Sequence, residues 1–194
     1  MAEDIATLAP KVLRSLLNET LFGAPKGWAF VINQGEPGFV TTLKSLTAAQ
    51  VSQAPGPGRK PIVSHANHVL FGYELVNRAI GGDHSAFENA DWNAAWKLEQ
   101  VTEAEWADLL KRIEEHARKL FESAPLQVGN GEEIMLTGLF GVAAHNAYHL
   151  VQSVRFFAIS ARHSRLHRPG CIRPRCKSCV ARLAGRYLPT LPRQ

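Results

Sequence analysis

The feature that most constrains the fold is the three- and four-residue spacing of apolar side chains in four long segments. This spacing places the apolar residues on one face of an α-helix. The segments are residues 3–20, 61–80, 103–123 and 132–162 of the 194-residue chain. No alternating strand pattern of useful length occurs, and WAFVIN at 28–33 comes nearest to one. The sequence therefore predicts an all-α fold, arranged as a four-helix bundle.

Local signals define where these helices begin and end. Pro61 is favourable in a first helical turn, and Gly81-Gly82 ends the second long helix. Thr102 followed by Glu105 forms a Thr-x-x-Glu capping box at the start of the third helix. The connection 22–59 is turn-rich around one expected short helix, TTLKSLTAAQVSQ, and 83–101 reads as irregular. These signals predict helix boundaries, not the contacts between helices.

Charge divides the chain into two parts. Nine of the 22 Lys and Arg residues lie in 161–194, which holds no Asp or Glu, while the remainder holds 13 basic and 17 acidic residues. We therefore expect one domain over 1–162 and a basic, Cys- and Arg-rich extension over 163–194 with little ordered structure. Nucleic acid is not an expected partner of the acidic body, although it remains a candidate partner of the basic tail.

The tail holds all three cysteines, at 171, 176 and 179. Cys176 and Cys179 have zinc-like spacing, and His163 or His167 could supply a further ligand. A structural zinc site usually has two close-spaced pairs of ligands, and only one pair is present. A basic extension without metal is the favoured interpretation.

The N-terminal residues and the hydropathy bear on location. MAEDIATLAP carries acids where a signal peptide carries Lys or Arg. No uninterrupted run of about 18 apolar residues occurs, so no membrane span is expected. The sequence predicts a cytoplasmic protein.

Two pairs of histidines stand on helical segments that otherwise read as buried. His145 and His149 lie four apart in AAHNAYHLVQ, and His65 and His68 lie three apart in SHANHVLF. Each spacing places both imidazoles on one helix face. Two such helices can supply three nitrogens to one ion and leave a coordination position open, which is the catalytic pattern. The alternative is that the imidazoles hydrogen-bond only among themselves.

A ligating imidazole usually has an outer partner, which is a group hydrogen-bonded to the ring nitrogen that does not bind the metal. The outer partners of these histidines are less evident. The fourth helix holds no Asp or Glu after Glu133, so the partners must come from elsewhere. Asn67, Asn146 or a backbone carbonyl are the candidates. His84 follows a Gly-Gly-Asp turn and receives no role.

Three motifs resemble the DinB-like family of metal-binding bundles. HNAYHLVQ resembles the H-x-x-x-H-x-x-Q of the last helix, SHANHVLF resembles the second-helix histidine motif, and DWNAAWKLEQVTEAEW resembles the tryptophan-bearing segment before the third helix. The resemblance covers roughly residues 5–160. Val151 stands where the family often has glycine.

This resemblance implies an up-down-down-up bundle with a divalent metal ion, such as zinc, nickel, manganese or iron. The implied ligands are His68, His145 and His149, with His65 as an alternative ligand or as an outer partner of a ligand. The implied activity is that of a metal-dependent transferase or hydrolase that activates a thiol or water, with a small-molecule substrate such as a low-molecular-weight thiol. The resemblance also implies a homodimer. The alternative is a non-enzymatic, stress-related metal-binding protein, and no catalytic residue is named. Trp92, Trp96 and Trp106 are expected to pack in the core or wall one end of the metal pocket.

Overall fold

The computed structural model describes residues 4–124 and 133–166, and over 154–166 it describes the helix alone. The described residues are all-α. The four long helices are α1 (Ile5–Leu21), α4 (Ile62–Ile80), α6 (Glu103–Ser123) and α7 (Glu133–Leu166). Three short helices lie between them: α2 (Phe39–Lys44), α3 (Ala48–Val51) and α5 (Trp92–Ala95). The predicted all-α class and the four long helices are confirmed.

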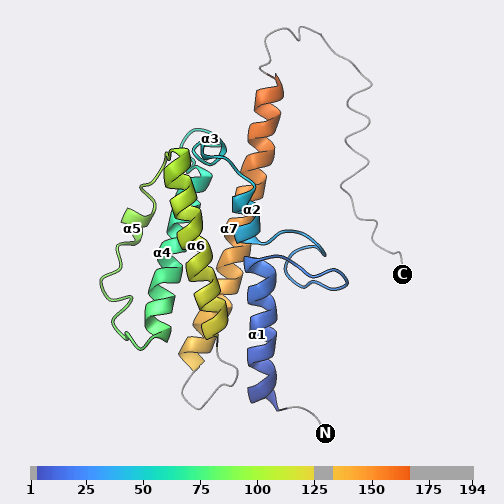
Figure 1. The fold of residues 1–194 in the computed structure, drawn as a ribbon, viewed down its shortest axis with the longest axis vertical. Coiled ribbons are helices and arrows are strands. Elements are labelled where there is room, and N and C mark those ends of the chain that lie inside the picture. The colour runs from blue at the N-terminus through green and yellow to red at the C-terminus, as the bar shows by residue number, and fades with distance from the viewer. Residues whose placement is uncertain (1–3, 125–132, 167–194) are drawn as a thin grey trace. The chain divides into compact units, whose positions relative to one another are not determined.

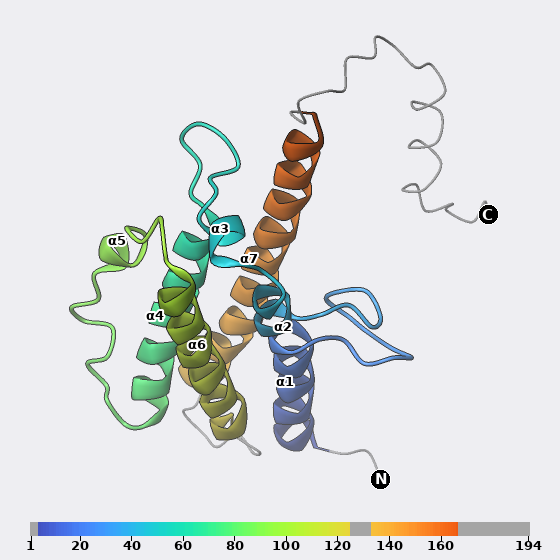
Figure 2. The same ribbon diagram turned by 45° about the horizontal axis from the view of Figure 1, so that its top comes forward.

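The long helices lie side by side within residues 4–160. In Figure 1, α1 and α7 rise while α4 and α6 descend. Figures 1 and 2 agree that α4 and α6 are neighbours along their lengths, with α7 beside α4 and α1 beside α6. The α4 helix can therefore present side chains to both α6 and α7.

One apolar core joins these helices. Fully buried side chains come from every long helix, as the three- and four-residue spacing predicts, but Ile5 and Val12 of the apolar pattern in α1 are exposed. Burial of each large aliphatic or aromatic side chain contributes about 1.5–3 kcal/mol. The core includes Leu13, Leu17, Phe39, Val69, Tyr73, Ile113, Leu120, Leu139 and Ala143. Trp106 is 2% exposed and donates from its indole Nε1 to the Leu46 carbonyl at 2.8 Å.

The predicted capping box is present at the start of α6. The Glu105 amide donates to the Thr102 hydroxyl at 3.3 Å, and the Thr102 amide donates to the Glu105 carboxylate at 2.7 Å. The connections were predicted less well. The single helix expected within 41–53 is wrong, because Ser45 closes α2 and Thr47 caps a separate helix, α3. The interpretation of 83–101 as irregular missed α5, which is capped by Asp91.

Residues 28–33 form no strand, and the connection 22–38 shows only an isolated bridge between Gly23 and Pro37. A buried carboxylate holds this connection instead. Glu19 of α1 is 1% exposed and accepts hydrogen bonds from the amides of Phe30, Val31 and Ile32. Burial raises the pKa of Glu19, but the three amide hydrogen bonds outweigh this effect and leave the pKa below its usual value.

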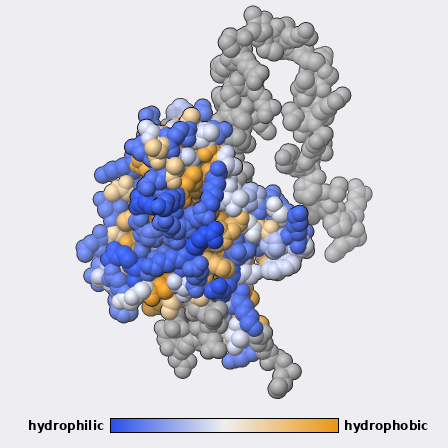
Figure 3. Space-filling model, in the orientation of Figure 1, coloured by the Kyte–Doolittle hydropathy of each residue, from blue (hydrophilic) through white to orange (hydrophobic). Residues whose placement is uncertain are grey.

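The surface seen in Figure 3 is largely hydrophilic with small apolar areas. Within the described residues, Glu133–Ser153 of α7 is long and apolar enough to cross a membrane by length and composition. Core helices of soluble proteins pass the same test. Asn146, His149 and Ser153 are buried on this helix, so at least one of its faces packs against the rest of the domain.

By its internal contacts the chain divides into two units, Met1–Ser160 and Ala161–Gln194. Residues 167–194, which include the predicted ligands Cys171, Cys176, Cys179 and His167, lie outside the described residues.

Candidate metal centre

The four histidines singled out in the sequence meet between α4 and α7. His65 and His68 lie on α4, and His145 and His149 lie on α7. His149 is 1% exposed, and His65 and His68 are each 8% exposed, whereas His145 is partly exposed. The i, i+3 and i, i+4 spacings place each pair on one helix face, and the packing of α4 on α7 brings the two faces together.

Three of the four imidazoles converge on a small volume. His68, His145 and His149 each offer one nitrogen, and these nitrogens all lie within 4.8 Å of one another. The Nε2 atoms of His68 and His145 are 3.3 Å apart, and those of His145 and His149 are 2.9 Å apart. Two nitrogens that bind one zinc ion tetrahedrally lie roughly 3.3–3.4 Å apart. The observed separations are therefore close to those of a three-histidine metal site.

Hydrogen bonding among the histidines explains this arrangement less well than a bound metal ion does. Each ring nitrogen of an imidazole has one in-plane position, either an N–H or a lone pair. His145 Nε2 faces two nitrogens at once, those of His68 and His149. It can form a good hydrogen bond with only one of them. A single cation between the three nitrogens would use one lone pair from each, so the donor set fits a metal ion.

His65 takes a different position from the other three. Its Nδ1 lies 3.0 Å from Nδ1 of His149, so His65 is on the side of the His149 ring that is opposite Nε2 of His149. When Nε2 of His149 offers its lone pair inward, Nδ1 carries the proton and donates it to His65. An outer partner of this kind fixes the tautomer and the orientation of a ligating imidazole.

Asn67 and Asn146, two of the candidate outer partners, form hydrogen bonds with other groups. The Asn67 amide donates to the Ala95 carbonyl at 2.8 Å. The Asn146 side-chain oxygen accepts from the Tyr73 hydroxyl at 2.7 Å. These amides attach α4 to the segment containing α5 and to α7. Nδ1 of His68 is buried and has no hydrogen-bond partner among the described residues.

Trp96 forms a wall of the histidine cluster. Its ring stacks on His68 with a centroid distance of 4.1 Å and an interplanar angle of 21°. It also meets the edge of His65 at 5.0 Å. Trp92 approaches His68 at 5.6 Å. The expectation that tryptophans wall the pocket holds for Trp96 and Trp92, whereas Trp106 lies in the core.

The environment keeps these imidazoles neutral. Burial lowers the pKa of His65 to about 4. Burial, together with the neighbouring histidines, lowers the pKa of His68 to about 4 and that of His149 to about 2. Burial also lowers the pKa of His145. Neutral imidazole is the form that binds metal, so near neutral pH the cluster is in the ligating state.

Two pockets flank the histidine cluster. One, of about 360 Å³, is lined by His65, Trp96, Tyr148 and Gln152 together with Gly58, Arg59 and Lys60. The other, of about 260 Å³, reaches His145 between α4 and α7. Small molecules can therefore approach the cluster from two sides.

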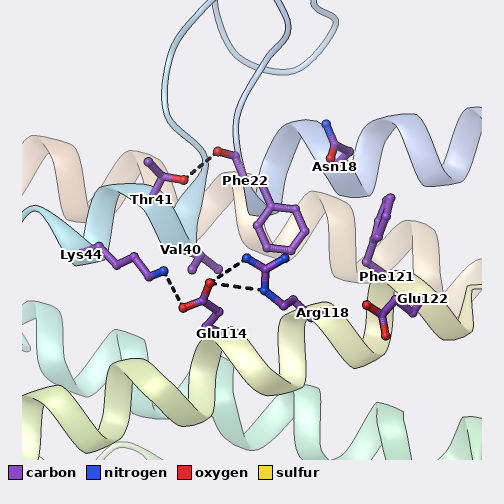
Figure 4. Close-up of a pocket in the computed structure, with 9 residues that line it drawn as sticks. All are labelled: Asn18, Phe22, Val40, Thr41, Lys44, Glu114, Arg118, Phe121 and Glu122. Atoms are coloured by element: carbon purple, nitrogen blue, oxygen red, sulfur yellow. Dashed lines mark hydrogen bonds and ion pairs between the residues drawn. The ribbon is translucent and has the colours of Figure 1, made fainter.

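A separate pocket of about 440 Å³ lies between α1, α2 and α6 (Figure 4). Glu114 in this pocket pairs with Lys44 at 2.5 Å and with Arg118 at 2.8 Å. None of its lining residues is a histidine or cysteine. Among the described residues, the group of potential ligands close enough to share one ion is His68, His145 and His149, and none of these lines this pocket.

Comparison with known proteins gives no further identification. No family model, no curated protein and no solved structure matches this chain.

Proposed function

We propose that the chain binds one divalent metal ion through His68, His145 and His149. We further propose that the bound ion takes part in a reaction of a small-molecule substrate. The observation that carries this proposal is the convergence of three neutral, largely buried imidazoles whose Nε2 atoms lie 2.9 Å and 3.3 Å apart in the two closest pairs. Such a site leaves a coordination position for an exogenous ligand. Zinc, nickel, manganese and iron are the candidate ions.

The chemistry supplied by a bound divalent ion is a lowered pKa of a thiol or water at that position. The residues of the chain prepare this site. His65 would accept the Nδ1 proton of His149 when Nε2 of His149 binds metal, and Trp96 stacks on the His68 ring. No carboxylate of a described residue is hydrogen-bonded to His68, His145 or His149, so three neutral ligands would leave the charge of a cation uncompensated. That charge favours an anionic fourth ligand, such as a thiolate.

The reaction class proposed is that of a thiol-dependent transferase or a hydrolase. The resemblance to DinB-like proteins supports this class. The rise of α1 and α7 and the descent of α4 and α6 agree with the up-down-down-up bundle that the resemblance implies (Figure 1). A cytoplasmic homodimer is proposed from the sequence and the resemblance alone.

A second candidate function is metal binding without catalysis. Among the described residues, no Asp or Glu is hydrogen-bonded to the three converging imidazoles, so no general base is assigned. A metal-loaded sample that turns over no thiol conjugate and no ester would favour this candidate.

Elemental analysis of the purified protein tests the proposal. About one metal ion per chain is expected in the wild type and none in the His145→Ala/His149→Ala variant. His84→Ala is the matched control, because His84 is exposed in a loop. Equal metal content in the wild type and the double variant would overturn the proposed site.

A further inference from the structure

The pocket that reaches His145 is built from two facing helix stripes. On α4 the lining residues are Val69, Gly72, Tyr73 and Val76, which follow the i, i+3, i+4, i+7 pattern. On α7 they are Gly138, Gly141, Val142 and His145, with the same spacing. Phe87 and Trp92, from the connection between α4 and α6, complete the lining. Three of these lining residues are glycines, of which Gly72 is half-buried and Gly138 and Gly141 are exposed.

Close helix packing does not explain these glycines. A Cβ atom placed at Gly72, Gly138 or Gly141 would meet no heavy atom within 4 Å outside its own immediate backbone. Glycine in a helix interior is destabilising relative to alanine. Glycine at these three positions therefore lowers helix stability without allowing a closer approach of the backbones. Their effect is to leave the pocket of about 260 Å³ open beside His145.

The chemistry of the lining defines what the pocket accepts. The polar groups of the lining side chains are the His145 imidazole nitrogens, the indole N–H of Trp92 and the Tyr73 hydroxyl, and this hydroxyl already donates to Asn146. The remaining side chains of the lining are apolar. Phe87 is 48% exposed and Trp92 is 39% exposed. Large apolar side chains left open around a concave site are typical of ligand pockets. The pocket is smaller than those that enclose a whole drug-sized ligand, so it suits one part of a ligand.

We propose that this pocket, lined by Gly72, Gly138 and Gly141, binds an apolar group of a small-molecule ligand whose polar end reaches His145. The apolar group is about the size of an aromatic ring or a short branched alkyl chain. This inference rests on the proposed function, because it places the substrate of the same metal site. A pocket of this kind would favour apolar thiols over small hydrophilic thiols.

The test compares benzyl mercaptan with 2-mercaptoethanol on the full chain loaded with Co²⁺. The thiolate-to-cobalt charge-transfer absorption reports sulfur binding directly. We expect benzyl mercaptan to bind at least about tenfold more tightly, because only its ring fills the apolar pocket. Gly138→Leu fills the pocket two helical turns from His145 and should abolish this preference while leaving cobalt content unchanged. Leucine is a better helix former than glycine, so the variant should fold.

Thr137→Leu is the matched control, because it puts the same side chain one residue earlier on α7, at an exposed position outside the pocket. It should retain the full preference for benzyl mercaptan. Gly72→Ala reduces the pocket from the α4 side and should weaken benzyl mercaptan binding alone. Equal affinity of the wild type for the two thiols, or an unchanged preference in Gly138→Leu, would overturn the inference.

Failure of the metal site can be distinguished from failure of the pocket. If the chain retains no cobalt, the proposed function fails. Toluene binding to the metal-free protein then shows whether the pocket accepts an apolar group. Saturation-transfer NMR should detect toluene on the wild type and on Thr137→Leu but not on Gly138→Leu. No toluene binding by the wild type, or equal binding by Gly138→Leu, would overturn the pocket independently of the metal.

Discussion

Nδ1 of His65 lies 3.0 Å from Nδ1 of His149, so the outer nitrogen of the most deeply buried histidine of the cluster faces a side chain of another helix. His68, one turn further along α4, instead approaches the Nε2 side of the cluster through His145. Two histidines only three residues apart therefore have different positions relative to the same site. This difference predicts different consequences when each is removed.

Replacing His65 and His68 separately distinguishes an outer partner from a ligand. His68→Ala should abolish stoichiometric metal binding, because two imidazoles remain. His65→Ala should retain one ion per chain with affinity reduced about 10- to 100-fold, as is typical for the loss of an outer partner. Competition titration against a fluorescent chelator measures both, with His84→Ala as the control. The reverse pattern would assign His65 as the ligand and His68 as the outer group.

The stability of the metal-free protein should fall as the pH is lowered from about 6.5 towards 4. His65 and His68 have pKa values of about 4 in the folded chain, whereas histidine in the unfolded chain titrates near 6.5. Between these values the unfolded state binds more protons, so acidification favours unfolding. Urea denaturation at several pH values in the presence of a chelator measures this slope. His68→Gln should show a shallower slope, and a flat wild-type profile across this range would contradict the prediction.

Tyr73→Phe should destabilise the domain by about 1–3 kcal/mol, because the buried Asn146 side-chain oxygen loses its hydrogen-bond donor. Nδ2 of Asn146 already has no hydrogen-bond partner among the described residues. The exposed Tyr148 provides the control, since Tyr148→Phe removes a hydroxyl without removing a hydrogen bond between described residues. Chemical denaturation of both variants gives the comparison. Equal stabilities would show that the Tyr73–Asn146 pair contributes nothing net.

Glu19→Gln should destabilise the domain by about 1–3 kcal/mol near neutral pH, because a charged acceptor of three amide hydrogen bonds becomes neutral. The pKa of Glu19 is lowered in the folded chain, so its contribution is present above the unfolded pKa. The contribution is lost as the pH falls through the folded pKa, and the variant and the wild type should then converge in stability. Exposed Glu88 serves as the control through Glu88→Gln. Hydrogen exchange of the amides of residues 30–32 should accelerate only in Glu19→Gln.

Removal of residues 167–194 should leave the metal content and the helical circular dichroism signal unchanged, because all three proposed ligands lie in the unit Met1–Ser160. The Cys171→Ser/Cys176→Ser/Cys179→Ser variant of the full chain should behave in the same way. Loss of metal from either protein would indicate that the cysteines of the tail are ligands.

The sequence by itself determined the four long helices and the helical faces that carry the histidines. The spacing of apolar residues, the Thr102–Glu105 capping box and the breaks at Gly81 and Gly82 act within a few residues of the chain, so they can be read without the fold. The pairing of His145 with His149 is equally local, because a four-residue spacing on a helix already places both imidazoles on one face.

Only the tertiary structure decided how the two histidine pairs meet. His68 and His145 are 77 residues apart, and His65 and His149 are 84 residues apart. Their relative positions depend on how α4 packs against α7, which no local pattern specifies. The same holds for Trp96 stacked on His68 and for the glycine-lined pocket beside His145. Helical periodicity fixes the direction of each side chain about its own axis, but the rotation and offset between two helices are set by the packing of the whole core.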